Sequence, residues 1–87
     1  MRKRTIFELS AFEDLKQWQI IDNKTYRKII AIIENIKNYS SKSIAISEPL
    51  EGKLKGYWSM KIDEEHRLVY KITSTEIIII ACRYHYN

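Results

Sequence analysis

The stretch "IIIIACRYHYN", residues 77–87, constrains how the rest of the chain must fold. Four isoleucines, an alanine and a cysteine are typical of a strand that is buried on both faces. An arginine, two tyrosines and a histidine then follow, although terminal residues usually fray. We therefore expect residues 77–84 to form a strand inserted into a sheet, and the last residues to form the rim of an active site.

Length and composition predict one small globular domain over residues 1–87. Apolar residues make up 45% of the chain and charged residues 30%, which is an ordinary globular balance. A core of this size is modest, so a partner or a dimer would add stability. A single cysteine cannot form an intrachain disulfide, and no apolar run is long enough for a membrane span. These features indicate a cytoplasmic protein without a membrane contact, and the net charge of +4 weakly favours a polyanionic partner.

The segments before residue 77 predict an α+β fold. Residues 5–9, 57–62 and 66–72 are rich in β-prone side chains, and short polar breaks suited to hairpin turns separate the last strands. Two helices are expected between the first and second strands, with Ser10 capping the first and Asn23 the second. The second helix carries an apolar stripe of isoleucines at helical spacing. The order β-α-α-β-β-β predicts two helices packed on one face of a mostly antiparallel sheet.

Residues 39–55 lack this periodicity. Serines, Pro49 and Gly52 indicate a loop that has room for a short turn of helix.

The alternation of side chains along the strands predicts a basic surface. A hairpin that closes over three residues sets Lys61 directly opposite Arg67, and two facing cations destabilise a ladder unless an anion lies between them. Tyr57 shares their face, which points away from the helices. Arg83 joins this surface only if the last hairpin keeps the matching parity, which the sequence leaves open. A phosphate group would suit such a surface.

Metal, cofactor and thiol chemistry find little support in the sequence. No phosphate-binding loop, dinucleotide fingerprint, CxxC or HExxH motif is present, and no metal site or cofactor is predicted. Cys82 lies in the apolar strand, where a buried and inert thiol is expected.

RNA cleavage needs neither metal nor covalent intermediate, since the 2′-hydroxyl is its own nucleophile. The protein must supply a base, a cation and an acid. Glu48, Arg67 and His85 supply one of each. Each also has a simpler interpretation: a solvated loop carboxylate, a surface cation paired with Glu65, and a frayed imidazole. His66 flanks a turn and is assigned no role.

Two stretches resemble the YoeB (Txe) toxins of the RelE-like toxin–antitoxin superfamily. They are "EPLEGKLKGYWSMKIDEEHRLVYKI", residues 48–72, and "IIIIACRYHY", residues 77–86. The resemblance implies a RelE-like fold and a ribosome-dependent endoribonuclease that cleaves mRNA in the ribosomal A site. By the same resemblance, Glu48 is the general base, Arg67 the phosphate stabiliser, His85 the general acid and Tyr86 a terminal residue needed for activity. A YefM/Phd-like antitoxin and a toxin homodimer are also implied.

Three positions depart from the pattern of that family. Glu51 stands where a basic residue is expected, Lys61 replaces an arginine, and Asn87 follows the tyrosine that usually ends the chain. Lysine keeps the charge but loses the bidentate grip of arginine on phosphate. None of these changes removes the predicted acid–base pair.

Two other functions share parts of this pattern. A ParE-like relative would keep the fold and act on gyrase, but such relatives lack the combination of Glu48, Arg67 and His85. A non-catalytic RNA- or ribosome-binding module is equally compatible with the net charge.

Overall fold

The computed structural model of this chain describes residues 3–84. His85 and Tyr86, which carry two of the predicted roles, lie outside the described residues. In chain order the elements are β1 (Arg4–Phe7), α1 (Leu9–Ile21), α2 (Asn23–Asn38), α3 (Ser40–Ala45), β2 (Glu48–Pro49), the 3-10 helix η1 (Gly52–Leu54), β3 (Trp58–Lys61), β4 (Arg67–Ile72) and β5 (Glu76–Ala81).

The strands form a five-stranded sheet in the order β1-β5-β4-β3-β2. Within residues 3–84, β1 and β5 pair in parallel and the other neighbouring strands are antiparallel. Strand β5 therefore lies inside the sheet, as its apolar sequence predicts, although it ends at Ala81 rather than at residue 84. The predicted α+β class and mostly antiparallel sheet are confirmed.

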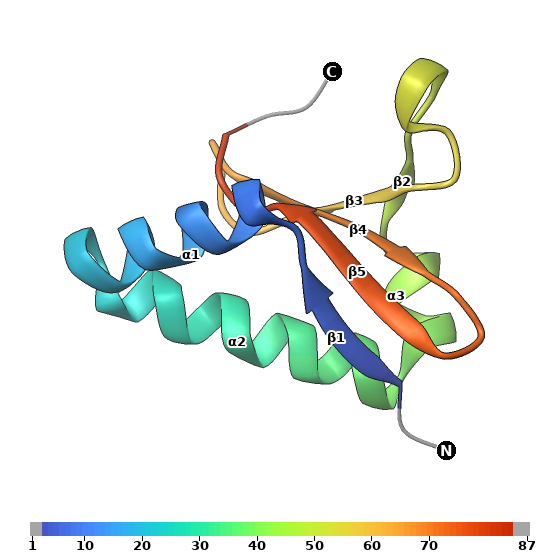
Figure 1. Ribbon diagram of the computed structural model, residues 1–87, viewed down its shortest axis with the longest axis horizontal. Helices are drawn as coiled ribbons and strands as arrows, with labels where there is room; N and C mark the ends of the chain where they lie inside the picture. Colours follow the sequence, from blue (N-terminus) through green and yellow to red (C-terminus); the bar gives the residue numbers. More distant parts are fainter. Residues whose placement is uncertain (1–2, 85–87) are drawn as a thin grey trace.

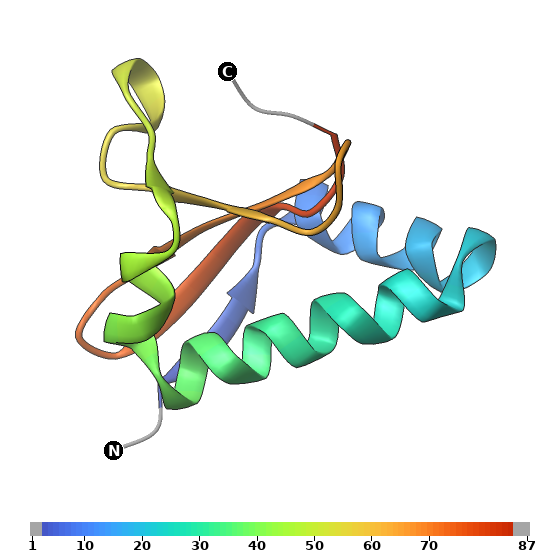
Figure 2. The same ribbon diagram turned by 180° about the vertical axis from the view of Figure 1, so that it is seen from behind.

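Helices α1 and α2 lie side by side over one face of the sheet, and α3 continues from the end of α2 toward β2 (Figures 1 and 2). Alternate residues of β3, β4 and β5 enter the core beneath these helices, among them Leu68, Tyr70 and Ile77. The opposite face buries a second, smaller cluster built on Val69 and Ile80. Because both faces are covered, four consecutive isoleucines fit in β5.

The segment over residues 39–55 has more structure than the predicted loop. It contains α3, the two-residue strand β2 and η1, and its serines satisfy nearby carbonyls: Ser40 Oγ donates to Ile36 O at 2.8 Å and Ser47 Oγ to Ser43 O at 2.7 Å. Pro49 lies in β2 at the edge of the sheet, where its missing N–H costs no ladder hydrogen bond. The interpretation of Pro49 as a loop marker was wrong for this reason.

The predicted caps of the two long helices were also wrong. The first helix begins at Leu9, and Ser10 Oγ instead donates to Ile80 O in β5 at 2.7 Å. Asp22, not Asn23, caps α2, because its carboxylate accepts from Thr25 N at 3.3 Å. No helix within residues 3–84 is long and apolar enough to cross a membrane.

Candidate active site

The β3–β4 hairpin and the short strand β2 bring two of the predicted catalytic residues together. Ile62 N donates to His66 O at 2.9 Å, so the turn closes as predicted and Lys61 lies opposite Arg67. On the other side of β3, Glu48 pairs with Ser59. The side chain of Arg67 reaches across β3 to Glu48, and their Nη1 and Oε1 atoms are 2.9 Å apart.

The environments of these two charged groups differ. The Arg67 side chain is 20% exposed and its Nη1 also donates to Ser59 Oγ at 3.3 Å, whereas the Glu48 side chain is 70% exposed. The guanidinium is thus held in a fixed position, while the carboxylate lies on an open surface. Such a pair presents a fixed cation and a solvent-accessible proton acceptor to a molecule that approaches this face.

Lys61 and Tyr57 lie on the same face as Arg67. Lys61 Nζ is 3.0 Å from Glu64 Oε1, so each of the two facing cations has an acidic neighbour. Tyr57 packs against the smaller cluster on this face, and Lys71 Nζ lies 5.5 Å from the centre of its ring. The predicted basic surface is therefore present, with acidic side chains neutralising part of it.

Arg83 lies beside α1. Its guanidinium carbon is 5.7 Å from the centre of the Trp18 ring and 4.9 Å from that of Tyr84. A bulge precedes it: Val69 pairs with Ala81 but Tyr70 pairs with Ile79, which leaves one extra residue in β5. Because of this bulge, the regular alternation of side chains does not continue to Arg83, and the condition for placing Arg83 on the face of Arg67 is not met.

The last described residue is bonded directly to the residues around Arg67. Arg67 N donates to Tyr84 O at 3.1 Å, and Tyr84 N donates to His66 Nδ1 at 2.8 Å. His66, to which the sequence assigned no role, is buried with 8% exposure. The chain is thus fixed beside Arg67 at the residue that immediately precedes His85.

Comparison with known proteins establishes the family. A family model described as "YoeB-like toxin of bacterial type II toxin-antitoxin system" matches residues 7–86. The chain belongs to the YoeB-like toxin family. The Toxin YoeB of Mycobacterium bovis is 44% identical over 80 residues, which cover 92% of this chain and 94% of that relative. This YoeB-like chain is accordingly a toxin of a type II toxin–antitoxin system.

Solved structures of YoeB proteins share the fold. The YoeB dimer from Staphylococcus aureus has a TM-score of 0.83 and 35% identity, and covers 99% of this chain and 100% of its own. A heterotetrameric YoeB–YefM toxin–antitoxin complex from the same organism has a TM-score of 0.83 and 38% identity, with the same coverage. The RelE-like fold expected from the sequence is confirmed for this YoeB-like chain.

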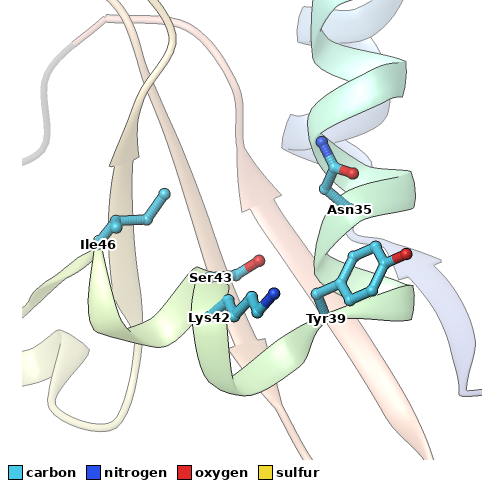
Figure 3. A pocket seen from close by; sticks show the side chains of 5 residues that line it. All are labelled: Asn35, Tyr39, Lys42, Ser43 and Ile46. Atoms are coloured by element: carbon cyan, nitrogen blue, oxygen red, sulfur yellow. The ribbon is translucent and has the colours of Figure 1, made fainter.

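A hollow of about 320 Å³ lies elsewhere on the YoeB-like fold, at the junction of α2 and α3 (Figure 3). None of the predicted site residues that the structure describes lines it. Its lining consists of Asn35, Tyr39, Lys42, Ser43 and Ile46.

The YoeB-like site offers no metal centre within residues 3–84, where no group of three or more His, Cys, Asp or Glu side chains is placed to hold an ion.

Cys82 is the buried thiol that the sequence predicts, and we expect it to be unreactive. Its Sγ donates to Ala11 O at 3.7 Å, and burial, together with the Asp14 carboxylate, raises the pKa of the thiol to about 12. Since the thiolate is the reactive form, iodoacetamide at pH 8 should alkylate the native protein at least about a thousandfold more slowly than the unfolded protein. Mass spectrometry of timed samples measures both rates, and native alkylation within about tenfold of the unfolded rate would contradict this prediction.

Proposed function

We propose that this YoeB-like toxin is an endoribonuclease that cleaves mRNA in the ribosomal A site and so inhibits translation. The observation that supports this most is the Glu48–Arg67 pair at 2.9 Å, with Tyr84 fixed beside it by the hydrogen bond from Arg67 N. The family resemblance assigns a general base and a phosphate stabiliser to these two residues. It assigns the general acid to His85, the residue after Tyr84.

The proposed reaction needs only two proton transfers. The Glu48 carboxylate accepts the proton of the 2′-hydroxyl, and the 2′-oxygen forms a bond to the adjacent phosphorus. The bond from phosphorus to the 5′-oxygen breaks, and the His85 imidazolium donates a proton to that leaving oxygen. The products are a 2′,3′-cyclic phosphate and a 5′-hydroxyl, while Arg67 stabilises the negative charge that develops on the phosphate.

The remaining predicted residues would bind the RNA around this centre. Lys61 and Arg83 are proposed to contact phosphates, and Tyr57 to complete the RNA-binding surface. Tyr86, near the C-terminus, is proposed to be required for activity. An incoming phosphate competes with Glu48 for the guanidinium of Arg67. Breaking that ion pair would release the carboxylate to act as a base only when substrate is bound.

The open position of Glu48 predicts that the isolated protein is a weak nuclease. Its side chain is 70% exposed, so little in the protein orients a flexible RNA strand against it. Since positioning contributes several powers of ten to a rate, cleavage of ribosome-bound mRNA should be at least about a thousandfold faster than cleavage of the same RNA free in solution.

Single-turnover assays on matched transcripts, with and without programmed ribosomes, measure this difference. Equal rates on the two substrates would contradict ribosome dependence. Inhibition of translation with the mRNA left intact would instead favour a non-catalytic toxin.

We also propose neutralisation by a YefM/Phd-like antitoxin and a toxin homodimer, as the solved YoeB–YefM complex and YoeB dimer suggest. The net charge of +4 suits a small acidic antitoxin encoded beside the toxin. Coexpression with a tag on the antitoxin should yield a stable complex in which ribosome-dependent cleavage is abolished. Failure of the two chains to copurify would contradict this assignment.

A further inference from the structure

Three polar side chains of α1 bind the backbone at the end of β5. Ser10 Oγ donates to Ile80 O at 2.7 Å, Asp14 Oδ2 accepts from Cys82 N at 3.1 Å, and Trp18 Nε1 donates to Cys82 O at 2.8 Å. These residues are spaced four apart, so they form one row along the helix. Figure 1 shows the end of the described chain running between α1 and the turn that joins β3 to β4.

His66, immediately before β4, binds the same backbone segment two residues further along, at Tyr84. Its Nδ1 accepts from Tyr84 N at 2.8 Å, which requires that Nδ1 carries no proton. Its ring meets the Trp18 ring edge-on, with centroids 4.8 Å apart and planes at 86°. The imidazole is thus fixed by packing as well as by its hydrogen bond.

Side-chain hydrogen bonds hold the backbone of residues 82–84, which lie beyond the last residue of β5. Strand β5 ends at Ala81, directly after the bulge, so the next two residues lie outside the strand. Tyr84 has a φ of 64°, a backbone conformation that a residue with a side chain rarely adopts. Such a conformation persists when its surroundings hold it, and here His66 binds the N–H of Tyr84 while Arg67 N binds its carbonyl.

We infer that Asp14, Trp18 and His66 are positioning residues that hold the backbone of residues 82–84 and thereby fix Tyr84 beside Arg67. This inference rests on the proposed function, because the proposed general acid, His85, is the next residue in the sequence. Its effect on catalysis is exerted through backbone groups, and none of the three side chains needs to touch the RNA.

Two substitutions of His66 separate its hydrogen bond from its packing. His66→Phe keeps a ring against Trp18 but has no acceptor for Tyr84 N, whereas His66→Asn loses the ring and can place its amide oxygen where Nδ1 lies. Ile33→Val is the control for lost stability, since Ile33 is buried in α2 with 5% exposure and is not among the side chains that bond residues 82–84.

Two readouts test the inference: hydrogen exchange of the Tyr84 amide by NMR, and the single-turnover cleavage rate on ribosomes at saturating and subsaturating protein. For His66→Phe we expect exchange at least about tenfold faster and cleavage about tenfold or more slower, with the half-saturating concentration unchanged. His66→Asn should restore most of both values, and Ile33→Val should leave both near those of the wild type. If His66→Phe does not fold, Trp18→Phe removes the donor to Cys82 O and is measured in the same way.

The exchange measurement needs no RNA, so it is independent of the proposed nuclease activity. Wild-type exchange and cleavage in His66→Phe would overturn the inference, as would equal defects in His66→Phe and His66→Asn. A wild-type toxin that cuts no RNA would refute the proposed function, while the dependence of Tyr84 exchange on the acceptor at residue 66 would still support the backbone restraint.

Discussion

Replacing Glu48 with glutamine is expected to lower the single-turnover rate of ribosome-dependent mRNA cleavage by about 100- to 10,000-fold. The amide cannot take the proton of the 2′-hydroxyl, but it has the size of the carboxylate and can still accept a hydrogen bond from Arg67. Because the Glu48 side chain is 70% exposed, the fold should be retained. Cleavage of a defined transcript on programmed ribosomes, measured alongside thermal unfolding, gives both quantities.

Glu51→Gln is the matched control for this substitution. It makes the same change of charge at an exposed residue just after β2, three positions further along the chain. Cleavage by Glu51→Gln should stay within about threefold of the wild type, since Glu51 is exposed, lies outside the Glu48–Arg67 ion pair, and has its charge screened by solvent and salt. A Glu48→Gln variant as active as this control would exclude Glu48 as the base.

Replacing Arg67 with alanine should have an effect of similar size, about 100- to 1,000-fold on the cleavage rate. The substitution removes the one guanidinium that is placed within 3 Å of Glu48 among the described residues. Arg67→Lys should recover only part of the activity, because lysine restores a charge without the planar fork that grips a phosphate through two bonds. Rates at saturating toxin separate this loss from weaker binding.

Arg27→Ala serves as the control for Arg67→Ala. Arg27 is exposed on α2, and its loss makes the same change in net charge away from the hairpin. If both variants lose activity equally, total charge rather than local geometry governs the reaction. Retention of full activity in a folded Arg67→Ala variant would contradict the proposed role of the guanidinium.

The sequence was informative wherever one face of an element was buried. Alternation along residues 57–62 and 66–72 predicts which side chains share a face, and a hairpin that closes over three residues predicts the pairing of Lys61 with Arg67 that the structure shows. The run of four isoleucines likewise predicts a strand covered on both faces, and β5 lies between β1 and β4. Burial of apolar area leaves a strong periodic signal, so these features could be predicted.

Features that depend on single hydrogen bonds left no such signal. Strand β2 is only two residues long and contains Pro49, so its position was set by the edge of β3 rather than by its own composition. Ser10 has the sequence pattern of a helix cap, yet its hydroxyl binds Ile80 O, a partner seventy residues away in the chain. Tertiary contacts decided both cases.

The candidate site was predictable in part for the same reason. The hairpin register placed Lys61 opposite Arg67, but the ion pair of Arg67 with Glu48 depends on β2 pairing with β3, which the sequence did not indicate. His66 was assigned no role because a turn-flanking histidine is common. Its burial and its bond to Tyr84 N come from contacts with residues far from it in the sequence, Trp18 and Tyr84. A histidine and a tryptophan that converge on the same backbone segment are visible only in three dimensions.

The central claim, cleavage of mRNA by acid–base chemistry, is tested most directly by mapping RNA ends on translating ribosomes exposed to the wild-type toxin or to His85→Gln. The proposed mechanism predicts wild-type cuts at the A-site codon that leave a 5′-hydroxyl, and equal ribosome binding but no cuts with His85→Gln. Ends that carry a 5′-phosphate, or cuts by His85→Gln at the wild-type rate, would contradict it.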